Sequence, residues 1–585
     1  MPIMLSKPRP LAEVASRPPI EREQLEPSTT TPGSVPAEEA SGVYLPEGSR
    51  SERYIAAALF VLSLLYLCIF RHYSLIDADE GIVLQGAQRI LDGQVLYRDF
   101  FSFFTPGSYY FNALLFRVFG DSFLVARTAV AFIGAAFSPI TYLLTRRVCS
   151  REIGLLVTGL MTITALPVRF LVLHNWDSTL LACLALYCAV RWLESPHAKW
   201  AFATGSLVAL TGLFEQSKGA GLLLGLGLGF LIITFGDRQR RLFARAQVVA
   251  VAIGLTWPLV VTVIFFASQH ALIAMLAGWL WPLQHYSTAN RVSYGYLSFS
   301  DNTLHTIFFS GSWAIRLPTI LAISPSFWIP LLPLFGVALL PRLVADIWRG
   351  RSARPEWAYY VLVSSAVSGL LLSVVAVRAD VVHFVYLQPI FFLVLAWILD
   401  GRGIRVPFVR RLGPVAGFCV ALPLLTMAMP LLVRAAGSHY TLVTRRGVVN
   451  TPIKDTVVEH VQAHVAPGER ILVYPYMPFF YYLTSTYSPT RFEYYQPGMH
   501  TREQSLDFLS QLKAHPVRVV LWEPAFSEHI RYSWPNTRAR DLASDPVADY
   551  IAQEYRSCAY LESALNFHFL FMVRKDSVCP LVETN

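Results

Sequence analysis

Long apolar runs, separated by short loops that hold most of the charged residues, decide what this chain can fold into. A helical apolar run of about 20 residues matches the thickness of a bilayer. Hydrophobic residues make up 54% of the 585 residues and charged residues only 15%, too few to cover a soluble surface. We therefore predict a polytopic α-helical membrane protein.

About eleven of these runs are expected to be membrane spans, within a range of about ten to thirteen. The range reflects two weaker segments, 106–119 and 303–317, because each is either a juxtamembrane helix or a true span. The eleven runs cover residues 54–70, 122–145, 153–173, 176–193, 200–214, 219–235, 247–267, 318–340, 358–377, 384–399 and 413–434.

Arginines gather in four of the loops, around residues 146–151, 238–245, 342–354 and 402–411. Positive residues are retained in cytoplasmic loops, and an even number of runs lies between successive loops of this set. The formal charge of +9 therefore reflects membrane orientation, and we expect no nucleic-acid partner. Residues 1–52, rich in Pro, Ser, Thr, Glu and Ala without an apolar period, predict a disordered cytoplasmic tail.

The composition changes after about residue 436, where the membrane part of the chain (53–436) is expected to end. Short strand patterns at 471–474 and 517–522 flank a helix-like stretch at 502–513. This alternation predicts a small α/β domain over 437–585, which the parity of the spans assigns to the extracytoplasmic side. Cys558 and Cys579 both fall in this domain, and the sequence leaves open whether they form a disulfide.

The densest group of charges on the predicted extracytoplasmic face is Asp77, Asp79 and Glu80, directly after the first run. Carboxylates at a membrane boundary are costly and are frequently functional. If the substrate is a sugar on a lipid phosphate, one carboxylate is needed as general base, and cations are needed to neutralise the departing phosphate. Asp77 or Asp79 suits the first role, and Lys218 and Arg378 suit the second.

Each of these residues also has a purely structural interpretation. Asp79 could cap a helix that begins near Gly81, and Lys218 could be a snorkelling lysine at the end of a span. Arg378 and Asp380 could form a salt-bridged turn. His383 could be an interfacial histidine, and Asp177 could bond a neighbouring helix end.

The acidic loop sits in a longer recognisable stretch. Asp77-Ala78-Asp79-Glu80-Gly81 is followed by Gly93-Gln94-Val95-Leu96-Tyr97-Arg98-Asp99-Phe100, then by Pro106, Tyr109-Tyr110 and Phe119-Gly120-Asp121-Ser122. Ser217-Lys218-Gly219 and Arg378-Ala379-Asp380 through His383 continue the pattern. The sequence resembles the GT-C superfamily of polyprenyl-phosphate-sugar-dependent glycosyltransferases, in the branch of protein O-mannosyltransferases and aminoarabinose transferases.

The resemblance implies inverting transfer of a sugar from a polyprenyl-phosphate donor to an acceptor hydroxyl or other nucleophile on a glycan, lipid or protein. Catalysis would occur in the first extracytoplasmic loop, about residues 72–121, of a multi-pass protein of the bacterial inner membrane. Asp77, Asp79 and Glu80 would be catalytic. The residues that would bind the donor are Lys218, Arg378, Asp177, Asp380, His383, Arg98 and Asp99.

One stretch departs from the family pattern. Relatives have a charged residue or histidine before a Pro-Pro pair, where this chain has Phe103-Phe104-Thr105-Pro106. A metal contact therefore does not transfer to this position, so we assign no metal ligand and leave a divalent metal open as a cofactor.

Two other function classes fit a membrane protein of this kind, a lipid or sugar transporter or flippase and a non-catalytic GT-C-like scaffold. Transporters place polar residues near the bilayer midplane on broken helices. Here the strongest cluster lies in a loop, and the runs 153–173, 219–235 and 358–377 carry almost no charge. This distribution favours an enzyme over a transporter, and the acidic triplet argues against a scaffold.

Overall fold

A computed structural model describes most of the chain after the N-terminal tail. The described residues are 50–236, 244–286, 290–297, 301–352, 354–401, 413–437, 440–496, 498–537, 545–564 and 567–580. The tail expected at 1–52 lies outside them except for its last three residues, which begin the first helix. The arginines of the loop 402–411 also lie outside the described residues.

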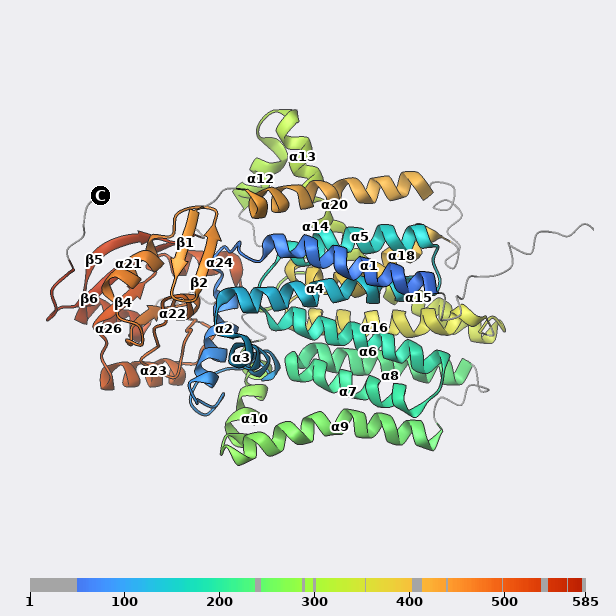
Figure 1. Ribbon diagram of the computed structural model, residues 1–585, viewed down its shortest axis with the longest axis horizontal. Helices are drawn as coiled ribbons and strands as arrows, with labels where there is room; N and C mark the ends of the chain where they lie inside the picture. Colours follow the sequence, from blue (N-terminus) through green and yellow to red (C-terminus); the bar gives the residue numbers. More distant parts are fainter. Residues whose placement is uncertain are drawn as a thin grey trace, which may run out of the picture. The chain divides into compact units, whose positions relative to one another are not determined.

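Long helices run side by side through the membrane part of the chain (Figure 1). Among the described residues, 8 helical segments are long and apolar enough to cross a membrane. This confirms the polytopic helical architecture, while the number of spans remains a prediction. The 8 segments are Arg50–Phe70, Phe123–Thr145, Arg151–Val168, Gln216–Gly236, Arg245–Ser268, Trp313–Trp348, Glu356–Val377 and Pro414–Ala436.

Within these segments and between them, the helices have the following bounds. They are α1 (Arg50–Leu67), α4 (Phe123–Thr145), α5 (Arg151–Val168), α6 (His174–Glu194), α7 (Ala198–Phe214), α8 (Gln216–Gly236), α9 (Arg245–Ser268), α10 (Leu272–Trp281), α14 (Pro325–Trp328), α15 (Leu331–Trp348), α16 (Pro355–Val377), α17 (Val381–Tyr386), α18 (Gln388–Asp400) and α20 (Gly413–Ala436).

Glycines let α8 and α16 cross in direct backbone contact. A Cβ atom on Gly221 would lie 2.3 Å from the carbonyl oxygen of Gly369, and one on Gly225 would lie 2.4 Å from that of Ser365. Only glycine fits at such a distance, and small residues at four-residue spacing are a common device for packing membrane helices closely. The apolar run at 219–235 is therefore hydrophobic all around the helix, and its glycines mark the face that packs on α16.

The two weaker segments form short helices. Residues 106–119 contain the whole of α3 (Gly107–Phe119), which has 13 residues and follows α2 (Ala78–Leu91). A helix of that length is too short to cross a bilayer at about 1.5 Å per residue, which favours the juxtamembrane alternative. The second segment forms α12 (Asp301–Phe309) and the start of α13 (Trp313–Ile323).

A small α/β domain follows α20, as the sequence predicts. Its four-stranded sheet has the order β3-β4-β6-β5, with β3 and β4 parallel and the other pairs antiparallel. Strands β3 and β4 and helix α23 coincide with the predicted elements. Its strands and helices are β1 (Tyr440–Thr444), β2 (Gly447–Thr451), α21 (Thr456–His464), β3 (Leu472–Tyr474), α22 (Phe479–Thr484), α23 (Arg502–Ala514), β4 (Val519–Trp522), α24 (Phe526–Ser533), α26 (Pro546–Glu554), β5 (Tyr555–Glu562) and β6 (His568–Arg574).

The domain also contains the disulfide that the sequence left open. Cys558 and Cys579 are bonded, with their Cα atoms 5.6 Å apart. The bond ties β5 to the residues that follow β6, so it fastens the edge strand of the sheet to the C-terminal segment.

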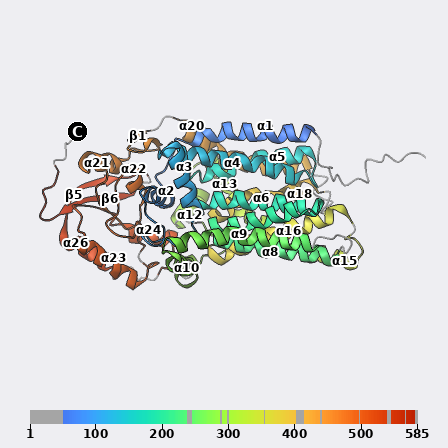
Figure 2. The same cartoon turned by 60° about the horizontal axis from the view of Figure 1, so that its bottom comes forward.

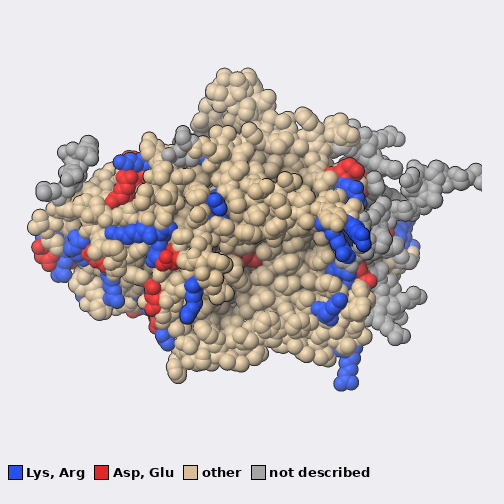
Figure 3. Space-filling model, in the orientation of Figure 1, with Lys and Arg blue, Asp and Glu red and all other residues tan. Residues whose placement is uncertain are grey.

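The α/β domain lies at one end of the long helices, where it packs on α2 (Figure 2). A Cβ atom on Gly81 of α2 would lie 2.1 Å from the backbone nitrogen of Phe479 in α22, so the two helices touch through their backbones. Charged side chains gather near the two ends of the helices, and the face between them is largely uncharged (Figure 3). This distribution is typical of a protein that spans a bilayer.

Candidate functional site

The acidic loop forms the beginning of α2. Asp77 is the N-cap of this helix, because its Oδ1 atom accepts a hydrogen bond of 3.0 Å from the backbone N–H of Asp79. The cap expected of Asp79 is thus supplied by Asp77, and Asp79 lies in the first turn. The residue before the cap, Ile76, has φ of 57°, a conformation that a β-branched residue rarely adopts.

The strained turn at Ile76 is stabilised through both its side chain and its backbone. Its side chain is fully buried, and its backbone N–H donates to the Ser74 hydroxyl over 3.0 Å. Strain of this kind persists only where the surroundings hold it, and it is common at functional sites. Here it directly precedes the N-cap residue Asp77.

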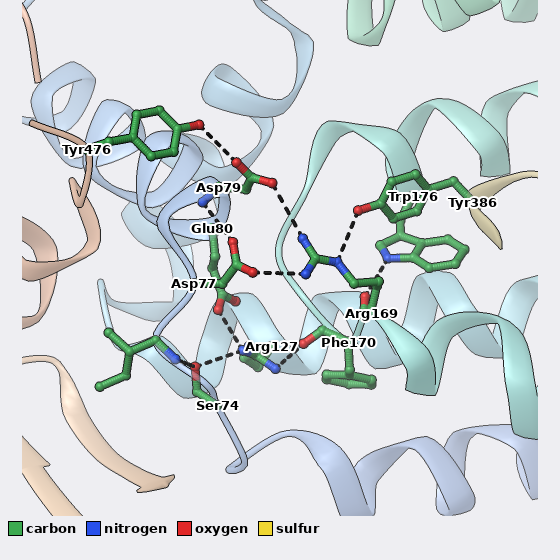
Figure 4. Close-up of polar contacts among 11 residues, drawn as sticks. Ser74, Asp77, Asp79, Glu80, Arg127, Arg169, Phe170, Trp176, Tyr386 and Tyr476 are labelled. Carbon is green, nitrogen blue, oxygen red and sulfur yellow. Dashed lines mark hydrogen bonds and ion pairs between the residues drawn. The ribbon is translucent and has the colours of Figure 1, made fainter. Parts of the chain in front are cut away.

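Arg169 joins the two aspartates (Figure 4). Its Nη1 atom lies 3.0 Å from Asp77 Oδ2, and its Nη2 atom lies 3.4 Å from Asp79 Oδ2. The Nε atom of Arg169 lies 3.5 Å from the hydroxyl of Tyr386. On the other side of Asp79, the hydroxyl of Tyr476 donates to Oδ1 over 3.0 Å.

Asp79 is the more accessible of the two aspartates. Its side chain is 41% exposed against 16% for Asp77, and its contact with Arg169 is the longer one. Desolvation by the surrounding protein raises the pKa of Asp79 above its ordinary value, and the neighbouring charge of Asp77 adds to this effect. Arg169 and the Tyr476 hydroxyl act in the opposite direction.

Glu80 points the other way, into the protein interior. Its Oε2 atom accepts from Arg127 Nη2 over 2.6 Å, and its Oε1 atom accepts from the backbone N–H of Val172 over 3.0 Å. Arg127 also donates to the carbonyl of Tyr73 and to the hydroxyl of Ser74. Both side chains of the pair are at most 1% exposed, so Glu80 fastens α2 to the helices behind it.

Arg378, Asp380 and His383 form a second charged cluster, which follows α16 and opens α17. Asp380 caps α17 and accepts from His383 Nδ1 over 2.6 Å, while Arg378 Nε contacts its other oxygen. Burial acts to raise the pKa of Asp380, but His383 and Arg378 hold it below its usual range. The salt-bridged turn considered for Arg378 and Asp380 is thus present.

The members of this cluster differ in how accessible they are. The side chain of His383 is 24% exposed and that of Arg378 only 8%. Arg378 donates to Asn290 Oδ1 over 3.4 Å and to the carbonyl of Ser533, and it lies over the Trp534 ring. The ring of His383 lies 6.0 Å from that of Tyr386, whose hydroxyl contacts Arg169, so the cluster adjoins the acidic pair.

Lys218 is enclosed within the bundle. Its Nζ atom lies 2.8 Å from Glu215 Oε2 and donates to Ser178, Thr179 and the carbonyl of Asn175 at 2.9–3.0 Å. Burial acts to raise the pKa of Glu215, but Lys218 lowers it to about 2. Lys218 is therefore a buried, fully bonded ion-pair partner rather than a snorkelling side chain.

The remaining predicted site residues hold the first loop together. Asp177, which is buried, accepts from the hydroxyl of Ser108 over 2.5 Å and so ties α6 to α3. Asp99 pairs with Arg98 at 2.8 Å and accepts from the backbone N–H of Val95 at 2.7 Å. Arg98 reaches the carbonyl of Gln269.

The structure thus brings Asp77, Asp79 and His383 together and adds three residues that the sequence did not single out. Tyr386 and Tyr476 lack any local signal, since a tyrosine near an apolar run is ordinary. Arg169 did have a local signal in the sequence, because it is a charged residue inside the apolar run 153–173. That run is too long as a span, because α5 ends at Val168 and Arg169 turns toward the aspartates.

Among the described residues, no group of three or more His, Cys, Asp or Glu side chains has the arrangement needed to hold a metal ion.

Comparisons with known proteins found three similarities. The family model of dolichyl-phosphate-mannose-protein mannosyltransferases matches residues 105–264. The crystal structure of ArnT from Cupriavidus metallidurans bound to undecaprenyl phosphate is 12% identical, covers 90% of this chain and 98% of its own, and has a TM-score of 0.50. The apo structure of the same protein is 13% identical, covers 89% and 97%, and has a TM-score of 0.45. No curated protein sequence matches the chain.

Proposed function

We propose that this chain is a GT-C-type membrane glycosyltransferase that moves a sugar from a polyprenyl phosphate to an extracytoplasmic acceptor; its similarity to the matching family and to ArnT supports the proposal. The observation that carries the proposal is the pair Asp77 and Asp79 at the start of α2. One arginine holds both carboxylates, and one of them is accessible. The undecaprenyl phosphate bound by ArnT and the dolichyl phosphate in the name of the matching family share the polyprenyl-phosphate chemistry.

We assign the role of general base to Asp79. In the reaction the acceptor oxygen attacks the anomeric carbon, the bond from that carbon to the phosphate oxygen breaks, and the acceptor proton moves to the carboxylate. A base must reach the acceptor, and Asp79 is the more exposed carboxylate. Both oxygens of each aspartate have a partner, but Arg169 lies 3.4 Å from Asp79 Oδ2 against 3.0 Å from Asp77 Oδ2, so the outer oxygen of Asp79 is held less closely.

Arg169 belongs on the acceptor side of the sugar in this scheme. In an inverting single displacement the base and the leaving group lie on opposite faces of the ring. Arg169 contacts both aspartates directly, so its role is to orient the two carboxylates and to favour the ionised form of Asp79.

The departing phosphate then needs another cation, and His383 is the accessible one in the second cluster. In its protonated form the ring donates from Nδ1 to Asp380 and presents Nε2–H to a phosphate oxygen. Arg378 and Lys218, whose side chains are enclosed, would act at longer range through the local charge. Such preorganised positive charge stabilises a leaving phosphate without protonating it.

The disulfide between Cys558 and Cys579 supports an extracytoplasmic α/β domain, because disulfides persist in oxidising compartments. We propose that the protein lies in a bacterial inner membrane, with the N-terminus in the cytoplasm and the acidic pair at the outer surface. A polyprenyl-linked sugar presented in the outer leaflet would then meet Asp79.

The test is sugar transfer from a panel of polyprenyl-phosphate sugars by purified protein in lipid nanodiscs. We expect wild type to transfer at least one sugar, and Asp79→Asn to lower kcat by about 10²–10⁴-fold, the usual contribution of a general base. Asp77→Asn is the matched control, since asparagine also caps helices, and it should retain measurable transfer. Absence of transfer from every donor, with wild-type protein folded, would contradict the proposal.

A further inference from the structure

We propose that Tyr476 of the α/β domain is a positioning residue for Asp79, so that the domain forms part of the catalytic centre. This inference rests on the proposed function, since it takes Asp79 as the base. The residue comes from outside the membrane part of the chain, 397 positions after Asp79.

The hydroxyl of Tyr476 fixes one oxygen of the base. It donates to Asp79 Oδ1 over 3.0 Å, while Arg169 lies nearer Oδ2 at 3.4 Å (Figure 4). A hydrogen bond donated to an ionised carboxylate is stronger than one between neutral groups. The carboxylate is thereby held at one rotation, and the Oδ2 atom, with the longer contact, is left for the acceptor hydroxyl.

Tyr476 is itself well supported. It lies between β3 and α22, and its ring contacts the rings of Tyr494 at 5.8 Å and Trp534 at 5.8 Å. Helix α22 then packs backbone to backbone on α2 at Gly81. The tyrosine and the helix that carries Asp79 are therefore parts of one packed unit, which is what a positioning contact requires.

The aromatic rings around Tyr476 also contact the second charged cluster. Trp534 lies 6.0 Å from the Arg378 guanidinium group, and the carbonyl of Ser533 accepts from Arg378. The α/β domain thus contacts the base through Tyr476 and the Arg378–Asp380–His383 cluster through Ser533 and Trp534. In the proposed reaction, one domain therefore contacts both the general base and the cluster that would bind the departing phosphate.

The experiment compares Tyr476→Phe with Tyr487→Phe in the transfer assay, over a range of pH. The two variants are matched, because the Tyr487 hydroxyl also links the α/β domain to α2, donating to Asp92 Oδ2 over 2.7 Å at the far end of that helix. Each change removes one oxygen and keeps the ring contacts, so we expect both proteins to fold, with a Tm near that of wild type.

We expect Tyr476→Phe to lower kcat with little change in the KM for the donor, and to move the acidic limb of the pH–kcat profile upward by about one pH unit. The shift is upward because the hydrogen bond from Tyr476 lowers the pKa of Asp79. Without this hydrogen bond, Asp79 stays protonated up to a higher pH. Tyr487→Phe should leave the limb in place.

The outcomes separate this inference from the proposed function. If wild type transfers sugar, Asp79→Asn does not, and Tyr476→Phe matches Tyr487→Phe in kcat and in pH profile, then only the positioning role is wrong. If wild type transfers nothing, the proposed function itself fails. If Tyr476→Phe lowers Tm and kcat together without moving the acidic limb, the contact is structural and the inference is overturned.

Discussion

At the scale of single residues, the charge of Asp77 acts on the pKa of its neighbour Asp79. The negative charge of Asp77 raises the pKa of Asp79, so replacing Asp77 by asparagine should lower it. A base with a lower pKa stays ionised to lower pH. We therefore expect Asp77→Asn to move the acidic limb of the pH–kcat profile downward, measured in the transfer assay. A limb that vanishes or moves upward would make Asp77 the titrating base.

Glu80, the third carboxylate of the loop, belongs to the protein interior. Removing one partner of a buried ion pair typically costs about 3–5 kcal/mol, because the other charge is left uncompensated. We expect Glu80→Gln to lower the Tm of the purified protein clearly, while the folded fraction keeps kcat within a few-fold. The double variant Glu80→Gln/Arg127→Met should regain part of the stability. Loss of transfer at unchanged Tm would instead give Glu80 a role in the chemistry.

At the scale of elements, α2 is placed by its contact with α22. An alanine at Gly81 would put its Cβ 2.1 Å from the backbone nitrogen of Phe479, and backbone atoms cannot yield without moving the whole of α22. Overpacking of this kind typically costs about 1–3 kcal/mol. We expect Gly81→Ala to lower both Tm and kcat, because α22 follows Tyr476 directly in the chain.

The control for Gly81→Ala is Gly227→Ala in α8, where an added Cβ would meet no atom within 4 Å. Alanine is the better helix former, so this variant should keep or slightly raise Tm. Equal losses in the two variants, or none in Gly81→Ala, would show that the contact between α2 and α22 is looser than the structure describes.

The elements also explain how far the sequence alone could predict this protein. Apolar runs and short strand patterns are local, and the long helices of the membrane part, β3, α23 and β4 follow from them. The short helices α10, α21, α22, α24 and α26 were not predicted. The hairpin of β1 and β2 and the pair of β5 and β6 were not predicted. The partners of Asp79 depend on contacts between distant segments: Arg169 lies 90 positions away and Tyr476 397. Such contacts are fixed by packing, which no local pattern records.

At the scale of the whole molecule, the two ends of the bundle differ in their contacts. At one end, Glu52 at the start of α1 pairs with Arg151 at 2.7 Å, beside the Arg-rich loop that follows α4. At the other end, Tyr73 forms a backbone β-bridge with Asn450 in β2 of the α/β domain. Since positive loops are retained in the cytoplasm, the aspartates and the α/β domain should both face outward.

Cysteine labelling tests this orientation. The starting protein has the five free cysteines (Cys68, Cys149, Cys183, Cys188 and Cys419) replaced by alanine and keeps the disulfide. A membrane-impermeant maleimide should label Lys513→Cys, on the exposed face of α23, in intact cells, and Arg349→Cys, after α15, only once the membrane is opened. The reverse pattern would place Asp79 in the cytoplasm. A donor presented in the outer leaflet could then not reach it.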